Sequence, residues 1–509
     1  MAEQKQAGEH WGSRWGLIFA AMGAAIGTGN IWRFPREAAI NGGGAFMIPW
    51  LLFLFSWSIP LLIAEFTIGK HTRFGTIGAF KRFAGKKYAW MGAWMMLVNI
   101  FIMFYYAVVM GWVLKYFTVA ASGGLTADVD TEAMWESFVT SPAQVIFFQV
   151  LAIGISTFVV YRGIAQGIEK TNKLLIPGMF ILLIIAALWA LSLPGALNGL
   201  KYMFIIRGDS LGKADTWVSA LSQSAFSTSA GFGMAITYAV YMKRREDTTL
   251  NAFIAGLGNN AASLIAGIAV ICTVFALSTT NVEAIDVMKS GNEGLAFIHL
   301  TRLFTLMPGG VAVAGIFFLA MAFAAITSMI SGMEITVRNF MDHGWSRNHS
   351  LKVTSTMMFV FGLPSALIIV GGGVPAFLKN QDHVWSFGLI VSGIFVFFAV
   401  WRYGINKFRE EHINVEWNDL YIGRWWVYIM YLFPIQFMFL MLWFFSQSIA
   451  LHPDSWWNPF EPEGFATIVL QWGLALAILI RLNDWINKKP MIAPEIDDSE
   501  VVEVQPEYG

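Results

Sequence analysis

Long stretches without charge constrain this chain more than any other feature of its sequence. Nearly uncharged stretches lie at 51–63, 95–114, 174–193, 254–277, 311–330, 357–370, 390–400, 427–445 and 466–480. Several reach the roughly 20 residues that a helix needs to cross a bilayer, and the others do so with their polar flanks. Only 13% of all residues are charged, about half the usual share in a soluble protein. The sequence therefore predicts an all-α polytopic membrane protein.

The stretches divide into twelve expected transmembrane helices, with no soluble domain. These spans are predicted at 14–37, 42–70, 89–118, 143–161, 168–193, 215–243, 250–278, 309–341, 352–372, 384–407, 421–448 and 464–487. Spans 1–5 (14–193) and spans 6–10 (215–407) are expected to form two halves, followed by spans 11 and 12 (421–487). A segment at 1–13 precedes them and an acidic tail at 488–509 follows.

Lysine and arginine gather in alternate loops of this arrangement. They cluster at 70–87, 162–173, 243–245, 338–352 and 402–409, whereas the loop 119–142 contains four acids and no basic residue. Because basic loops remain in the cytoplasm, both termini are expected there. The net charge of zero gives no indication of a nucleic-acid partner. The single cysteine, Cys272, and the lack of a glycosylation sequon in an outside loop favour a bacterial inner (plasma) membrane.

Two of the predicted spans carry glycine-rich interruptions near their middle. Span 1 contains GAAIGTGN at 23–30, and span 6 contains STSAGFG at 227–233. Glycine inside a helix costs about 1 kcal/mol relative to alanine. Close helix packing is one explanation. The other is a transporter's central site, because breaks at corresponding positions of two inverted repeats expose carbonyl and N–H groups to ions and substrate. The polar residues within both clusters favour the site.

Five different motifs follow one another along residues 15–490. They are GTGNIWRFP at 27–35 with NGGGAFMIP at 41–49, FYY at 104–106, QSAFSTSAGFG at 223–233, Asn259, and AAITS at 324–328. Together they resemble the neurotransmitter:sodium symporter family, in its bacterial amino-acid transporter branch. The resemblance implies inverted five-helix repeats with broken helices 1 and 6. It also implies sodium-coupled transport by alternating access.

Two sodium sites follow from the resemblance. One would use the carbonyl of Ala25, the side-chain oxygens of Asn30 and Asn259, and Ser227. The other would use the carbonyls of Gly23, Ile26 and Ala324 with the hydroxyls of Thr327 and Ser328. Oxygen ligands suit a hard cation. Without the resemblance, Thr327 and Ser328 are explained as hydroxyls that bond back to their own helix.

The same resemblance implies a pocket for a neutral α-amino acid. Its carboxylate would meet the N–H groups of Thr28 and Gly29 and the Tyr106 hydroxyl. Its ammonium group would meet carbonyls near Ala25, Phe226 and Ser227, with the Ser229 hydroxyl. The pocket for its side chain would be lined by Ile102, Tyr106, Phe226, Phe232, Ser328 and Gly332. Because Gly332 replaces a bulkier residue of a bacterial relative, the side chain is expected to be large and apolar or aromatic.

Gates on both sides of the pocket are also implied. Arg33 would form the outer gate over Phe226, and Trp11, Tyr241 and Asp342 would form the inner gate. Two of the gate positions depart from the family pattern. The position of the acid that faces Arg33 is occupied by His383, with Asp382 beside it. The position of the inner-gate arginine is occupied by Gly8, so that either Lys5 replaces the arginine or the inner gate is weaker. Gly167 and Pro177 resemble a motif that unwinds span 5, or else they only bend it.

A chloride site is a further implication of the resemblance. The residues are Trp50, Gln223, Ser227, Asn259 and Ser263, where chloride-independent bacterial members carry a glutamate at position 263. An acid elsewhere, or a proton carried outward, is the alternative source of balancing charge. The expected partners are the amino acid and the lipid bilayer, for a monomer or a homodimer.

Other function classes fit the residues less well. An ion channel would need a ring of acids or a filter motif in its pore, and the spans contain neither. A membrane enzyme would need a metal cluster or a nucleophile–base pair, yet Glu65 and Glu334 stand isolated in the sequence. We therefore expect a symporter and not an enzyme, with a channel or a non-transporting amino-acid receptor on the same fold as the alternative.

Overall fold

The computed structural model describes residues 9–367, 376–488 and 490–492 of the 509-residue chain. Regular structure in these residues is helical, without a strand. Nine described segments are long and apolar enough to cross a membrane. They are Gly44–Thr72 (α4, η1 and α5), Lys86–Ala121 (η2 and α7), Pro142–Tyr161 (α9), Ile164–Ser192 (η3 and α10), Thr248–Leu277 (α15), Gly310–Asp342 (α19), Ala376–Tyr403 (α21), Trp425–Leu451 (α23) and Phe465–Lys488 (α24).

A tenth segment meets the same criteria only as a bent pair. It joins α1 (Arg14–Ala25) to the helical stretch Thr28–Ile40, which consists of α2 (Thr28–Ile31) and α3 (Arg33–Ile40), at an angle of 69°. Predicted span 6 corresponds to two shorter helices, α13 (Ala214–Ser227) and α14 (Met234–Ala239). Predicted span 9 corresponds to α20 (Arg347–Leu367), with 368–372 outside the described residues. Twelve spans therefore remain a prediction, whereas the all-α membrane fold is confirmed.

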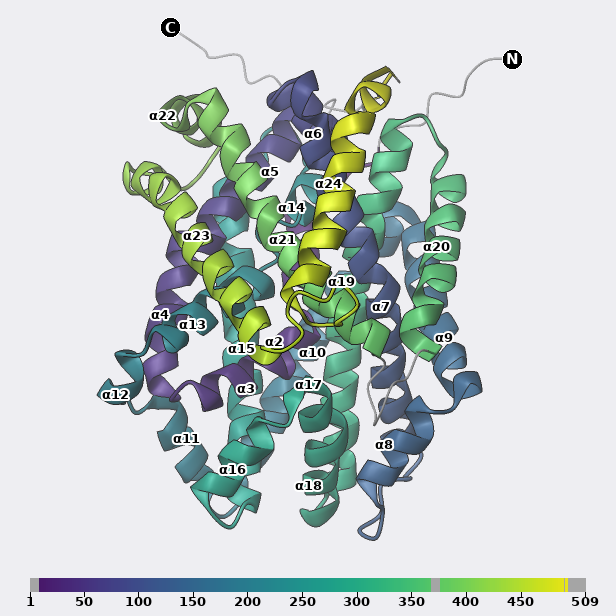
Figure 1. Cartoon of the computed structure of the whole chain (residues 1–509), viewed down its shortest axis with the longest axis vertical. Helices are drawn as coiled ribbons and strands as arrows, with labels where there is room; N and C mark the ends of the chain where they lie inside the picture. Colours follow the sequence, from purple (N-terminus) through teal and green to yellow (C-terminus); the bar gives the residue numbers. More distant parts are fainter. Residues whose placement is uncertain (1–8, 368–375, 489, 493–509) are drawn as a thin grey trace, which may run out of the picture.

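Shorter helices occupy the two ends of the bundle. They are α6 (Thr76–Phe83), α8 (Thr131–Val139), α11 (Ala196–Phe204), α12 (Gly208–Leu211), α16 (Asn281–Met288), α17 (Gly291–Glu293), η4 (Gly294–His299), α18 (Leu300–Leu306), α22 (Ile405–Phe408) and η5 (Arg409–Ile413). Figure 1 shows α6, α22 and the end of α24 at one end, and α8, α16 and α18 at the other. The first end carries Lys81 and Arg409, and the second carries Glu132. The second end also carries Lys289 and Arg302, so the sidedness of the chain in the membrane remains a prediction.

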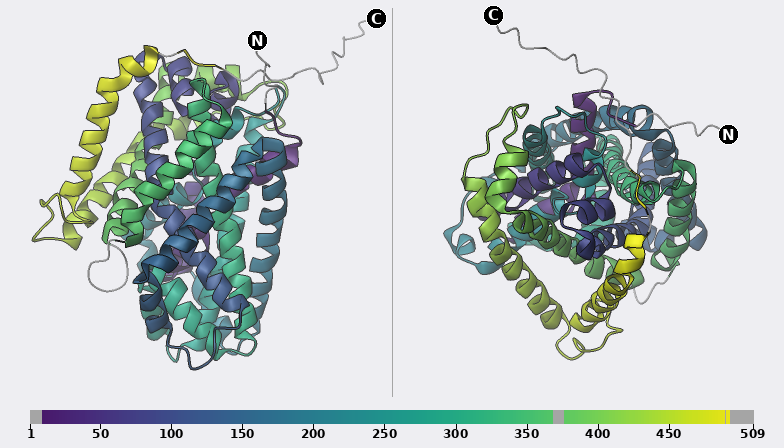
Figure 2. Two further views of the ribbon diagram at one scale, coloured as in Figure 1. Left: turned by 90° about the vertical axis from the view of Figure 1, so that its right-hand side faces the viewer. Right: turned by 90° about the horizontal axis from the view of Figure 1, so that it is seen from above.

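The centre of the bundle is formed by α7 and α19, which pack along each other and against α10, α20 and α21. By contrast, α23 and α24 lie at the edge and diverge from one another (Figure 2). Their outward side chains include exposed large apolar residues such as Phe439 and Leu474. Such a surface suits lipid and not water.

Candidate substrate and ion site

Both predicted interruptions are visible as breaks in helical structure. At the first, α1 ends at Ala25, and Ile26 and Gly27 are extended before α2 begins at Thr28. Gly27 leaves room for its neighbours, because a Cβ there would lie 3.1 Å from Ser328 Oγ. The first turn of a helix has N–H groups without partners in its own helix. The break therefore presents N–H groups at Thr28 and Gly29 beside the carbonyls that end α1.

The second break separates α13 from α14. Its backbone is left-handed at Ser229, Gly231 and Gly233, a conformation in which glycine is unstrained. The Glu65 carboxylate of α5 accepts hydrogen bonds from the N–H groups of Gly231 (2.8 Å) and Gly233 (2.6 Å). The interpretation of Glu65 as isolated is therefore wrong. A charged residue within a transmembrane span is costly and usually has a function. The position of Glu65 inside a predicted span could therefore have indicated its role from the sequence.

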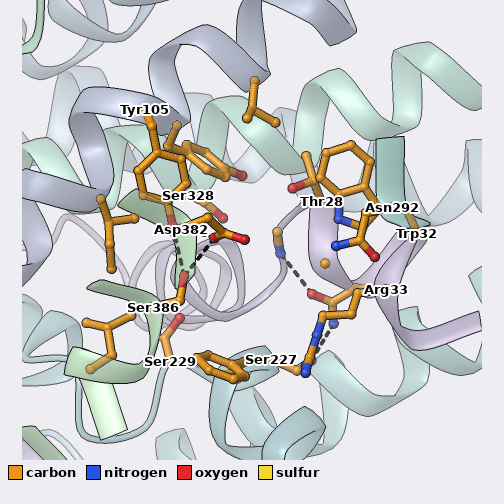
Figure 3. A pocket seen from close by; sticks show the side chains of 18 of the residues that line it. Thr28, Trp32, Arg33, Tyr105, Ser227, Ser229, Asn292, Ser328, Asp382 and Ser386 are labelled. Carbon is orange, nitrogen blue, oxygen red and sulfur yellow. Dashed lines mark hydrogen bonds between the residues drawn. The ribbon is translucent and has the colours of Figure 1, made fainter. Parts of the chain in front are cut away.

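A cavity of about 470 Å³ begins at the two breaks and extends toward Arg33 and Asp382. Ten of the eleven residues predicted to contact substrate line it: Ala25, Thr28, Gly29, Ile102, Tyr106, Phe226, Ser227, Ser229, Phe232 and Ser328. Figure 3 shows Thr28, Ser227, Ser229 and Ser328 around it. The buried Tyr106 hydroxyl lies beside Thr28 and Ser328 without a well-formed hydrogen bond to either. It is thus able to donate to a ligand.

Gly332 is the predicted pocket residue that does not line the cavity. A Cβ at Gly332 would lie 2.3 Å from Met103 Sδ, so the space that this glycine leaves is filled by methionine. Met103 and Asn99 line the cavity in its place, and Asn99 donates to the Gly332 carbonyl at 2.7 Å. Gly332 therefore affects the size of the pocket only by setting the position of Met103, whose flexible side chain adapts readily to neighbouring groups.

Residues of the first predicted sodium site lie together. The Asn259 side-chain oxygen lies 2.8 Å from the Ser227 carbonyl oxygen and 3.3 Å from the Ala25 carbonyl oxygen. Oxygens this close repel each other unless the amide turns or a cation lies among them. Asn30 presents its amide nitrogen to Asn259, while its oxygen accepts from the Gly27 N–H. Asn30 would therefore have to rotate its side-chain amide, so that the oxygen and the nitrogen exchange places, to act as a ligand.

The second predicted sodium site is also brought together. The Ser328 hydroxyl lies 3.3 Å from the Gly23 carbonyl oxygen and 3.1 Å from that of Ile26. The Thr327 hydroxyl bonds back to its own helix, 3.0 Å from the carbonyl oxygens of both Phe323 and Ala324, as the alternative explanation expects. Neutral oxygens from α1 and α19 thus converge in a way that suits a hard monovalent cation.

Three of the five predicted chloride ligands, Ser227, Asn259 and Ser263, lie around the amide nitrogen of Asn30. Asn30 Nδ2 donates to Ser263 Oγ at 2.8 Å, and Asn259 Nδ2 donates to Ser227 Oγ at 2.9 Å. Gln223 accepts a hydrogen bond from Arg33 instead. The Trp50 ring packs on Phe34, with its buried indole N–H unpartnered among the described residues.

Arg33 occupies the predicted outer position. Its guanidinium carbon lies 4.9 Å from the centroid of the Phe226 ring. The guanidinium donates to Gln223 Oε1 at 2.7 Å and to Ser222 Oγ at 3.0 Å. The predicted acid is not its partner, because the pocket separates Arg33 from Asp382 (Figure 3).

The other half of the outer gate makes its own contacts. Asp382 accepts hydrogen bonds of 2.8 Å from the hydroxyls of Tyr105 and Ser386. His383 turns toward Ser448, with 3.0 Å between Nε2 and Oγ. At the cavity mouth, burial raises the pKa of the Glu293 carboxyl. The site is thus open on the side of Arg33 and Asp382.

The opposite side of the site is closed by Trp11 and Tyr241. Trp11 is buried, and its Nε1 donates to the Tyr238 carbonyl at 3.0 Å. Its backbone N–H donates to the Tyr241 carbonyl at 3.3 Å. Asp342 accepts from Arg338 Nε at 2.8 Å and from the Gly75 N–H at 2.7 Å. Gly8 and Lys5 lie outside the described residues.

An unpredicted charge cluster completes this closure. Arg347 donates to both carboxylate oxygens of Glu334, at 2.8 and 2.9 Å, and also forms an ion pair with Glu9. The Tyr241 hydroxyl donates to Glu334. Glu334 is therefore not isolated, which corrects the sequence interpretation. Burial raises the pKa of the Glu9 carboxyl, although Arg347 opposes the shift.

Family comparison decides what kind of protein carries this site. The model of the sodium:neurotransmitter symporter family matches residues 8–137 and 134–489. The chain belongs to this family. It is an integral membrane protein of a transporter family, and the predicted absence of enzymatic function agrees with this membership.

Comparisons with individual relatives agree with this family membership. An uncharacterized sodium-dependent transporter of Methanocaldococcus jannaschii is 34% identical, over 83% of this chain and 87% of the relative. A similar transporter of Bacillus subtilis is 31% identical, over 72% and 80%. The sodium-dependent serotonin transporter of Drosophila melanogaster is 28% identical, over 79% and 71%. The crystal structure of MhsT in complex with L-phenylalanine matches with a TM-score of 0.75 and 31% identity, covering 85% of this chain and 99% of MhsT.

Proposed function

We propose that this protein couples the inward movement of sodium to uptake of a neutral, apolar or aromatic α-amino acid by alternating access. The pocket at the two helix breaks carries this proposal. It combines N–H groups at Thr28 and Gly29 and the Tyr106 hydroxyl, which suit a carboxylate, with walls that include Ile102 and Phe226. The likeness to MhsT, whose structure contains L-phenylalanine, supports the same substrate class.

Two sodium ions are proposed, one in each oxygen cluster. In support, the Asn259 amide lies against the carbonyls of Ser227 and Ala25, and a second group of oxygens surrounds Ser328. The described residues contain no group of three His, Cys, Asp or Glu side chains that could hold a metal. Neutral ligands suffice because the substrate carboxylate supplies negative charge beside the ions. Chloride near Ser263 is the proposed balance for the remaining positive charge.

Orientation and environment belong to the same proposal. The end of the bundle with α6 and α22 would face the cytoplasm, since it carries the basic loops. The open side of the pocket would then face outward and the Trp11 side inward. A bacterial inner (plasma) membrane with both termini cytoplasmic is proposed, as a monomer or a homodimer.

Uptake into proteoliposomes tests the proposal against its alternatives. An inward sodium gradient should drive accumulation of one or more of the twenty amino acids, and a potassium gradient should not. A channel would carry sodium current without amino acid, and a receptor would bind amino acid without accumulating it. Tyr106→Phe provides a matched variant, because it removes only the hydroxyl and should weaken substrate binding while leaving the fold intact.

A further inference from the structure

Asn172 carries a buried polar atom that its own surroundings do not explain. It lies in the third position of α10, and none of its side chain is exposed. Its Nδ2 donates to the Ile168 carbonyl at 2.8 Å, four residues earlier in the chain. Its Oδ1 is buried and has no hydrogen-bond partner among the described residues. Buried oxygens are rarely left unpaired, so this oxygen requires an explanation.

The free oxygen points at α1 beside the second predicted sodium site. A Cβ placed on Gly23 would lie 2.2 Å from Asn172 Oδ1 and 3.0 Å from Thr327 Cβ. The Asn172 oxygen and the Thr327 side chain therefore lie within about 5 Å of each other, both next to Gly23. Gly23 and Thr327 both belong to the oxygen cluster that also includes Ser328.

The same contact also constrains which residue can occupy position 23. It lies inside α1, two residues before the helix ends, and its backbone is not among the left-handed positions. The helix break therefore does not require glycine here. The requirement comes from the close approach of Asn172 Oδ1, which any side chain at position 23 would displace. Asn172 Oδ1 thus lies against the backbone of Gly23, and the carbonyl of Gly23 faces Ser328.

We propose that Asn172 Oδ1 is a further ligand of the second sodium site, in addition to the carbonyls of Gly23, Ile26 and Ala324 and the hydroxyls of Thr327 and Ser328. The inference rests on the proposed sodium coupling. It assigns α10 to a site that otherwise draws its ligands from α1 and α19. A sodium ion there gives Oδ1 the partner that it lacks, while Nδ2 keeps its bond to Ile168.

Sodium binding to purified protein tests the assignment. Asn172→Leu preserves side-chain size and removes the oxygen. Asn251 is the matched control, because its Nδ2 also donates four residues back, to Asp247, and its Oδ1 is also buried and unpartnered. Saturable binding of radioactive sodium, measured without amino acid, should require about 10- to 100-fold more sodium in Asn172→Leu. Asn251→Leu should remain within about twofold of the unaltered protein.

A second variant covers failure of the leucine variant to fold. Asn172→Asp keeps the oxygen and adds charge, so it should lower the sodium concentration for half-saturation severalfold. Unchanged half-saturation in Asn172→Leu, or in Asn172→Asp where leucine does not fold, overturns the assignment. Absence of saturable sodium binding in the unaltered protein would instead refute the proposed function itself, so the two failures are distinguishable.

Discussion

Replacement of Arg347 by glutamine should open the cytoplasmic side of the protein. Arg347 is the cation between Glu334, whose side chain is fully buried, and Glu9. Removing one partner of a buried ion pair costs about 3–5 kcal/mol, because the remaining charge stays without compensation. Opening this side admits water to Glu334 and relieves that cost. The equilibrium should therefore shift toward the inward-open form by roughly two to four orders of magnitude.

Hydrogen exchange measured by mass spectrometry reports this shift directly. Exchange in α1 and α14 should rise strongly in Arg347→Gln, and external sodium should bind more weakly. Arg402→Gln is a matched control, since Arg402 donates to the Ala84 carbonyl and has no acidic partner among the described residues. The double variant Arg347→Gln/Glu334→Gln should restore protection by removing the uncompensated charge. Unchanged exchange in Arg347→Gln would refute the reasoning.

Further predictions concern the ions and the substrate. Asn30→Ala and Asn259→Ala should each insert normally yet raise the sodium concentration for half-maximal uptake, because each removes an amide from a dehydrated cation; an unchanged titration in both would leave them structural. Uptake should fall when gluconate replaces chloride, and Ser263→Glu should restore it; full activity in gluconate without gain in the variant would contradict a chloride role. Gly332→Ala should push Met103 into the cavity and weaken binding of the largest substrates by about 1–3 kcal/mol, measured against a small amino acid as control. A decarboxylated amine should not compete with its parent amino acid, and tight binding of the amine alone would exclude a carboxylate-directed pocket.

Local signals explain why much of the fold was predictable. Uncharged stretches identify helices such as α7 and α15, because the bilayer sets both their length and their composition. Glycine clusters at 23–30 and 227–233 identified both breaks for the same local reason. Broken spans are harder to count, since α13 and α14 are individually too short to meet the criteria for a span. The agreement therefore follows from properties that each segment carries by itself.

Contacts between distant residues were not predictable in this way. Arg347 was counted only as part of a basic loop, whereas its partners lie 13 and 338 residues away. The partner of Arg33 depends on whether the outer side is open or closed, which no alignment of positions specifies. The place of Gly332 behind Met103 depends on side-chain packing between α7 and α19. Residue type indicated which groups matter, but only the tertiary structure pairs them.

The contact of Glu65 with the second break also has a consequence for biogenesis. Glu65 and Gly231 are 166 residues apart in the sequence. At about 5–20 residues per second, a ribosome needs roughly 10–30 s to synthesise the intervening chain. During that interval the carboxylate resides in the membrane without the N–H groups that finally bind it. The helices that follow must therefore assemble around an acid already in place. Early truncations should be captured by insertion chaperones more strongly when residue 65 is glutamate than when it is glutamine.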